Sequence, residues 1–97
     1  MIILKNYPLI KEIFNTMPVG IVILDEDAKI LYASKMVEEI AGIEASLLLN
    51  KKAESQFQGL DMAAVTKGTF NGKLKTKTAS FKATCQAFQK YRILYLS

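Results

Sequence analysis

Residues 17–34, MPVGIVILDEDAKILYAS, decide the fold of this chain. The apolar run Val19–Leu24 is β-branched and aliphatic and is short, which favours a strand over a helix. Residues 25–28 contain no large apolar side chain and predict a turn, in which the Asp25 carboxylate accepts hydrogen bonds from nearby backbone N–H groups. Residues 29–33 resume the strand pattern, so the whole stretch predicts a β-hairpin.

A helix is expected directly after the hairpin. Ser34 is a favourable N-cap residue, and apolar side chains recur at helical spacing as far as Ala41. Glu38 lies close to the offset of a capping box, and Gly42 supplies a left-handed stop. These residues predict a short helix that ends at the glycine.

Residues 5–16 predict an amphipathic helix in front of the hairpin. Asn6 can cap this helix, Pro8 fits its first turn, and Pro18 ends it because the residue before a proline avoids the helical region. Its apolar stripe, which is our candidate dimer interface, consists of Leu9, Ile10, Ile13 and Phe14. The stripe either covers the chain's own sheet or contacts a second subunit, since exposed apolar stripes tend to bind partners.

The middle of the chain, residues 44–68, predicts short helical segments. Residues 45–49 suggest one helical turn, residues 50–54 a polar loop, and residues 60–65 a second short helix that ends near Gly68.

The last third of the chain follows the period of two that is typical of strands. The predicted strands are 70–78, Ser80–Phe88 and Tyr91–Leu96. Asn71-Gly72 suggests a bulge in the first of them. Gln89-Lys90 suggests a tight turn between the other two, although neither residue favours the positive φ that such turns need. Together with the hairpin, this order predicts an α+β fold of five antiparallel strands with helices on one face.

The hairpin resembles the opening of PAS domains, the sensory modules of bacterial signalling proteins. That family shows the pattern Pro-x-Gly-Ile-x-x-x-Asp-x-x-Gly-x-Ile-x-x-x-Asn, matched here by Pro18, Gly20, Ile21, Asp25 and Ile30. Ala28 replaces the usual glycine, and a left-handed position costs a non-glycine residue about 1 kcal/mol, so we expect a slightly different turn. Ser34 replaces the usual asparagine, and we expect it to keep the capping role.

The resemblance implies a PAS-like five-stranded antiparallel sheet with short helices on one face and an N-terminal amphipathic helix. We assign residues 1–97 to a single domain, with a leading helix at 1–16 and a PAS core at 17–97. The implied role is a signal-sensing and dimerisation module that regulates an attached histidine kinase or transcriptional regulator. Because the sequence stops at Ser97, we expect a module cut from a larger protein that holds the effector; a natural stand-alone domain is the alternative.

The chain has no histidine and a single cysteine, Cys85, so it contains no Ser-His-Asp or Cys-His arrangement and no cysteine cluster for zinc. Haem-binding PAS domains hold iron through a histidine, and the light-sensing flavin-binding members attach flavin to a cysteine within an Asn-Cys-Arg motif. Cys85 lies instead in Thr84-Cys85-Gln86, on a predicted strand. We therefore expect no enzyme activity, no catalytic or metal-binding residues and no bound cofactor.

Small residues on the predicted strand Ser80–Phe88 leave room for a small metabolite between sheet and helices. The candidate cavity residues are Ala83, Cys85 and Ala87. The same residues also allow close packing of the middle helices, and native interiors leave few voids. A buried cysteine is more often a small hydrophobic residue than a reactive group.

The net charge is +4, from 13 basic and 9 acidic side chains, and no Asp or Glu follows Asp61. We interpret the late lysines as a solvated strand face and expect no nucleic-acid partner, because no nucleic-acid motif accompanies them. No apolar run approaches the ~20 residues that span a bilayer, and a lone cysteine favours a reducing compartment. We expect a cytoplasmic homodimer without a membrane partner. A ligand-free scaffold of the same fold and a small basic nucleic-acid-binding domain are the alternatives.

Overall fold

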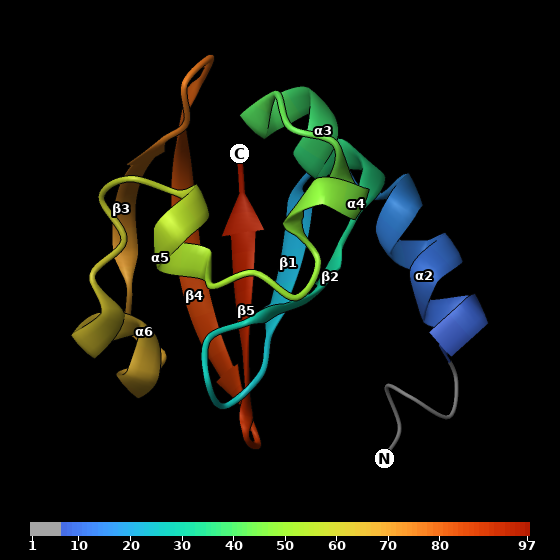
Figure 1. The fold of residues 1–97 in the computed structure, drawn as a ribbon. Coiled ribbons are helices and arrows are strands. Elements are labelled where there is room, and N and C mark those ends of the chain that lie inside the picture. Colours follow the sequence, from blue (N-terminus) through green and yellow to red (C-terminus); the bar gives the residue numbers. More distant parts are fainter. Residues whose placement is uncertain (1–6) are drawn as a thin grey trace.

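The computed structural model describes residues 7–97 (Figure 1). Five strands form one antiparallel sheet in the order β2-β1-β5-β4-β3. The strands are β1 (Gly20–Leu24), β2 (Ile30–Ala33), β3 (Asn71–Lys75), β4 (Ser80–Phe88) and β5 (Tyr91–Leu96). The predicted α+β class and five-stranded antiparallel sheet are confirmed.

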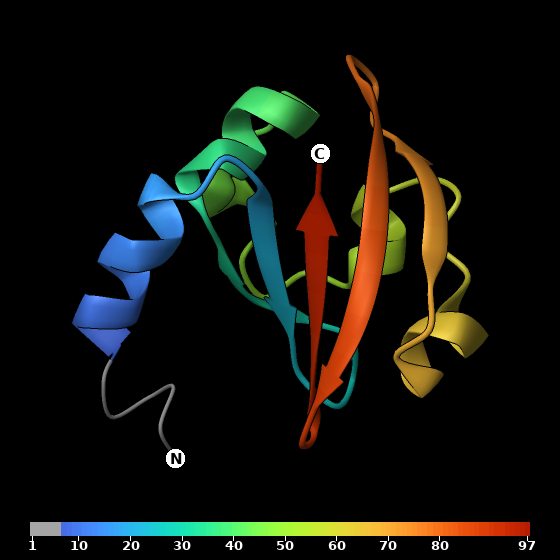
Figure 2. The same cartoon turned by 180° about the vertical axis from the view of Figure 1, so that it is seen from behind.

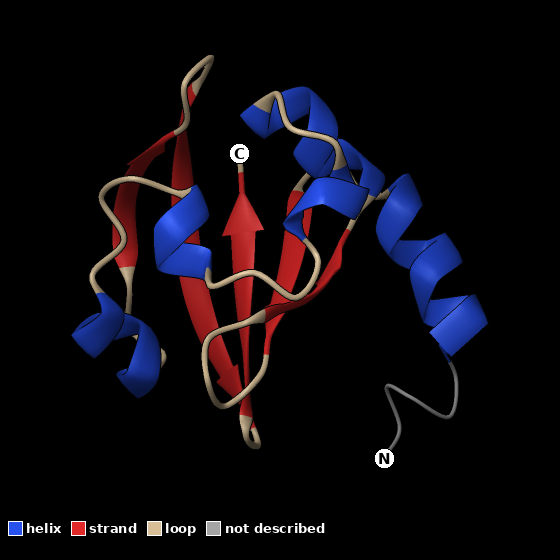
Figure 3. Cartoon of the chain, in the orientation of Figure 1, coloured by secondary structure: helices blue, strands red, loops and turns tan. Residues whose placement is uncertain are grey.

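Of the helices in residues 7–97, four short ones cover one face of the sheet, and a longer one lies beside its β2 edge (Figures 1 and 3). The helices are α2 (Tyr7–Thr16), α3 (Lys35–Ala41), α4 (Ala45–Leu48), α5 (Ala53–Gln56) and α6 (Met62–Lys67). The leading helix α2 ends before Pro18 as predicted, whereas its proposed cap, Asn6, lies outside the described residues. Among the described helices, none has both the length and the apolar character needed to cross a membrane.

Hydrophobic side chains pack on both faces of the sheet. The larger cluster fills the space between sheet and helices; there the rings of Phe57 and Phe81 meet edge to face with centroids 6.0 Å apart. A smaller cluster lies on the opposite face and consists of Ile21, Ile23, Tyr32 and Tyr91. This division follows from the alternation of side chains along each strand.

The β1–β2 turn is held by Asp25 as predicted. Its Oδ1 accepts hydrogen bonds from the backbone N–H groups of Asp27 at 2.8 Å and Lys29 at 3.0 Å. Ala28 has φ 61°, so an alanine adopts the left-handed conformation that we expected the turn to avoid. Its carbonyl accepts a hydrogen bond from the Ala53 N–H at 2.9 Å, and these contacts offset the strain of about 1 kcal/mol.

The expected capping roles of Ser34 and Glu38 are wrong. Ser34 occupies the N-cap position of α3 but is fully buried, and its Oγ accepts a hydrogen bond from the Ile21 N–H at 2.9 Å, so its side chain extends the β1–β2 pairing. The Oε2 atom of Glu38 accepts from the Ala45 N–H at 2.8 Å and so serves the start of α4. Gly42 ends α3 with φ 72°, as predicted.

The second half of the chain differs from the prediction in three places. The strand predicted over residues 70–78 is shorter, because β3 spans only Asn71–Lys75. Residues 50–54 are not all loop, because α5 begins at Ala53, which is buried in the core. The pairing of β3 with β4 is regular through residues 71–72, so the predicted bulge there is wrong; the observed register shift lies between Ile23 and Leu24. β4, β5 and their tight turn are confirmed, with Gln89 in the left-handed region at φ 55°.

Candidate functional site

The predicted dimer stripe of α2 divides into two parts. The side chains of Leu9 and Ile13 are 60% and 50% exposed. Phe14 is partly buried and packs against Tyr32, with ring centroids 5.8 Å apart. The side chain of Ile10 lies outside the described residues. One part of the helix therefore holds it to the sheet, and another presents apolar side chains to solvent.

Asn15 provides a polar connection between α2 and the core. Its Oδ1 accepts hydrogen bonds from the Lys35 backbone N–H at 2.9 Å and from the Tyr32 hydroxyl at 3.3 Å. Lys35 is the first residue of α3, and the first N–H groups of a helix have no partner within the helix. Sequence reasoning missed this role, since only the general preference of asparagine for capping hinted at it.

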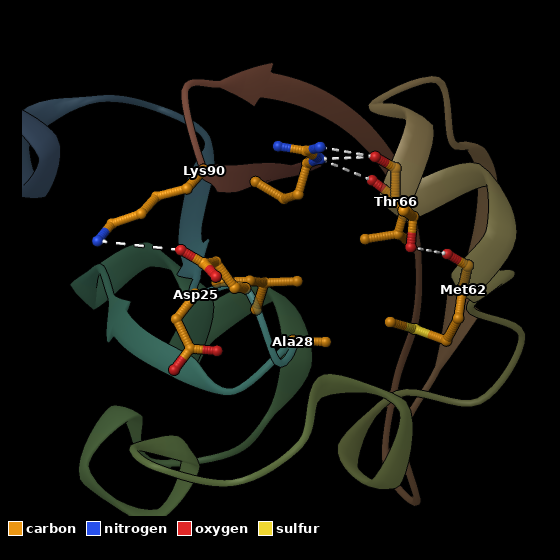
Figure 4. Close-up of a pocket in the computed structure, with 9 residues that line it drawn as sticks. Asp25, Ala28, Met62, Thr66 and Lys90 are labelled. Carbon is orange, nitrogen blue, oxygen red and sulfur yellow. Dashed lines mark hydrogen bonds and ion pairs between the residues drawn. The ribbon is translucent and has the colours of Figure 1, made fainter.

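A pocket of about 190 Å³ opens between the β1–β2 turn, α6 and the β4–β5 turn (Figure 4). Apolar and polar side chains from these three elements line it: Leu24, Asp25, Glu26, Ala28, Met62, Val65, Thr66, Lys90 and Arg92. Ligand pockets usually measure about 300–1,000 Å³, so this volume restricts the pocket to a small ligand.

Arg92 on the pocket wall is occupied by backbone carbonyl groups. Its Nε and Nη2 donate to the Thr66 carbonyl at 3.0 and 2.7 Å, and Nε also donates to the Val65 carbonyl at 3.2 Å. Its Nη1 donates to the carbonyls of Gln89 and Tyr91 at 3.1 and 2.7 Å. A cation at the carbonyl end of α6 also interacts favourably with the helix dipole. The guanidinium thus joins α6 to the β4–β5 turn.

The other polar groups of the pocket are also used by the fold or are open to water. Thr66 Oγ1 donates to the Met62 carbonyl at 2.9 Å. Lys90 Nζ lies 4.0 Å from Glu26 Oε1, and their side chains are 59% and 67% exposed, so this pair contributes little to stability. Among residues 7–97, no group of three or more His, Cys, Asp or Glu side chains is placed to hold a metal ion.

The three predicted cavity residues do not line this pocket. Ala83 is buried in the core, and the Cys85 Sγ lies 3.8 Å from the Val65 carbonyl oxygen. Ala87 adjoins Gly68, where an added Cβ would come within 2.7 Å of the Ala87 Cβ. Cys85 and Ala87 therefore lie where the end of α6 approaches β4 closely, and neither of them lines the pocket.

The thiol of Cys85 is poorly suited to chemistry. Burial raises the pKa of the Cys85 thiol, and the positive charge of Arg92 opposes this change only in part. Because the thiolate is the reactive form of cysteine, a raised pKa leaves the group protonated and inert near neutral pH.

The PAS domain family model matches residues 9–74. The chain belongs to the PAS domain family. The match extends from the exposed part of α2 through the hairpin and the short helices into β3, so the sequence resemblance and the observed topology agree.

Solved structures support the same fold for this PAS domain. The photoactive yellow protein domain of the sensor histidine kinase Ppr from Rhodospirillum centenum is 15% identical, with a TM-score of 0.66 over 90% of this chain and 91% of that chain. The PAS domain of nitrogen regulation protein NR(II) from Vibrio parahaemolyticus is 17% identical, with a TM-score of 0.67 over 92% and 96%.

A domain of a sensory box sensor histidine kinase/response regulator from Geobacter sulfurreducens is 12% identical, with a TM-score of 0.71 over 94% of this chain and 92% of that chain. At such identities the likeness concerns the fold alone. No curated protein sequence matched the chain.

Proposed function

We propose that this PAS domain is a signal-sensing and dimerisation module that regulates an attached effector, a histidine kinase or a transcriptional regulator, in bacterial signal transduction. Family membership supports a sensory role, and two of the similar structures come from sensor histidine kinases. The proposed role is not catalytic and requires no bound cofactor.

The division of α2 is the observation that carries this proposal. Leu9 and Ile13 are exposed apolar side chains on a helix that Phe14 holds against the sheet. Exposed apolar stripes of this kind mark interaction sites. We assign them to a homodimer contact, in which α2 of one subunit meets the same surface of the other.

The hydrogen bonds of Asn15 supply a route from the core to that contact. A shift of α3 or of Tyr32 changes the distance from Asn15 Oδ1 to the Lys35 N–H or to the tyrosine hydroxyl. The position of α2 therefore depends on these hydrogen bonds and on the packing of Phe14 against Tyr32. In the proposal, a signal that alters the core reaches the dimer through these contacts.

The signal we favour is a small metabolite held without a covalent bond in the pocket of Figure 4. Leu24, Met62 and Val65 offer it an apolar surface, and Lys90 and Glu26 offer charges at the entrance. The small volume of about 190 Å³ equally supports the ligand-free scaffold. In the scaffold, signals pass through packing and dimerisation alone.

Native mass spectrometry of the freshly purified chain tests the proposal. We expect the mass of a dimer, and a small excess mass identifies a ligand that co-purifies. A dimer without excess mass selects the scaffold. A monomer at all concentrations contradicts dimerisation and therefore the proposed function.

A further inference from the structure

The sheet face opposite the helices is basic over β3 and β4. Leu74 and Phe81 are paired across these strands and are buried on the helix side. The alternation of side chains then puts Lys73, Lys75 and Lys82 on the opposite face, where all three are exposed. Figure 2 shows this face, and none of the described helices lies across β3 and β4 there.

The three lysines do not contribute to the fold through ion pairs. Lys73 and Lys82 are direct cross-strand partners, which brings their Cβ atoms to about 4.5–5.5 Å, and like charges at this position are destabilising. In residues 7–97, an ion pair forms between Lys90 and Glu26 and none involves these three lysines. The cluster thus costs stability and leaves its charge open to solvent.

An apolar strip adjoins the lysines on the same face. Ile93 and Tyr95 of β5 are half-buried and extend the smaller hydrophobic cluster toward β4. Tyr95 is the cross-strand partner of Thr84, two residues from Lys82, and its hydroxyl donates to Gln86 Oε1 at 3.0 Å. The surface is therefore amphipathic, with fixed apolar groups beside flexible cations.

We propose that this basic face, made of Lys73, Lys75, Lys82, Ile93 and Tyr95, binds an acidic amphipathic segment of a partner protein. Carboxylates of such a segment neutralise the lysines, while its apolar side chains cover Ile93 and Tyr95. Complementary charge of this kind gives specificity and speeds association. The basic face contains no residue of α2, although Phe14 of α2 packs against the same smaller hydrophobic cluster as Ile93 and Tyr95. The peptide-binding test of this face does not depend on the proposed dimer.

The aromatic groups of this face favour a protein segment over single-stranded nucleic acid. Bases stack on exposed aromatic rings. Tyr32 and Tyr91 are only 6% and 7% exposed, and Tyr95 is half-buried with its hydroxyl bonded to Gln86. Phe88, at the end of β4 on the same face, is 38% exposed, but it lies six residues along the strand from Lys82. The rings nearest the lysines therefore offer little open area for stacking.

The test uses the full chain and a fluorescent synthetic peptide with leucine and glutamate at helical spacing, together with a matched peptide in which glutamine replaces glutamate. The variant Lys73→Gln/Lys75→Gln/Lys82→Gln removes the cluster. The control Lys29→Gln/Lys51→Gln/Lys67→Gln removes three exposed lysines elsewhere and gives the same net charge. Circular dichroism checks that both variants fold.

We expect the wild type to bind the glutamate peptide in low salt and to lose binding as salt screens the charges. The cluster variant should bind at least about tenfold more weakly, and the control should stay within about twofold of wild type. Absence of peptide binding, or equal losses in both variants, overturns the proposal. So does tighter, cluster-dependent binding to a thymidine oligonucleotide, which assigns the face to nucleic acid, or to vesicles that contain phosphatidylserine, which assigns it to a membrane.

Discussion

The side chain of Asn15 accepts a 2.9 Å hydrogen bond from the backbone N–H of Lys35, a residue 20 positions away in the sequence. This bond gives α3 an acceptor at its first turn, because the Oγ of Ser34 is occupied by the Ile21 N–H. The leading helix therefore contributes to the stability of the core.

Replacing Asn15 by alanine should weaken both the core and the attachment of α2. Loss of a capping side chain costs about 0.5–2 kcal/mol, so we expect a decrease of that size in the free energy of unfolding. Hydrogen exchange should speed up at the Lys35 amide and along α2. Glu12→Ala, at an exposed position of the same helix, is the control and should change little. Unchanged exchange at Lys35 in Asn15→Ala contradicts the role.

Replacing Arg92 by methionine should loosen the contact between α6 and the β4–β5 turn. The guanidinium binds four carbonyl groups, and we expect a loss of about 1–3 kcal/mol in the free energy of unfolding. Chemical denaturation measures it. The matched variant Lys90→Met removes an exposed cation and should cost far less. Equal losses for the two variants are inconsistent with a structural role for Arg92.

Gly68→Ala should be more damaging than Gly72→Ala. Gly68 has φ 72°, and an added Cβ would lie 2.9 Å from the Ala87 backbone nitrogen, whereas at Gly72 the nearest atom is the Phe70 Cζ at 3.4 Å. Left-handed strain and overpacking together predict about 1–3 kcal/mol of destabilisation at Gly68. Thermal unfolding of both variants checks the order, and a more damaging Gly72→Ala would contradict the packing described here.

The pH dependence of stability should carry a contribution from Cys85. Burial raises the pKa of its thiol in the folded state, so the unfolded chain releases the thiol proton at a lower pH than the folded chain. Stability from this group is complete below the unfolded pKa of about 8.5 and is lost as the pH rises through the folded pKa. Cys85→Ala should therefore show a shallower alkaline decline than wild type in denaturation series. Identical slopes would contradict the burial effect.

Local sequence patterns predicted the elements that depend on residues close together in the sequence. The alternation of side chains with a period of two predicted strands β4 and β5. Gly42 predicted the left-handed end of α3, and Asp25 predicted a turn held by hydrogen bonds within five residues. Ala28 shows the limit of such rules, because a contact from Ala53 helps to hold the alanine in a conformation that it disfavours alone.

The remaining features depend on partners distant in the sequence. Ser34 is drawn into the sheet by Ile21, and Arg92 binds carbonyls on α6 that no spacing rule connects to it. Lys73, Lys75 and Lys82 lie on a strand face as interpreted, whereas the other late lysines lie on α6 or between strands. The direct opposition of Lys73 and Lys82 could be recognised only from the register of β3 and β4. Which lysines face each other thus depends on strand pairing and could not be predicted from composition.

The oligomeric state of the chain decides whether α2 forms the proposed dimer contact. Light scattering on the eluting protein should give a dimer for the wild type and a monomer for Leu9→Ser/Ile13→Ser, because these exposed side chains of α2 form the proposed contact. Leu47→Ser, at a leucine 54% exposed on α4, is the control and should remain dimeric. A wild-type monomer, or a dimer that persists after the α2 substitutions, would contradict the proposed dimer contact through α2.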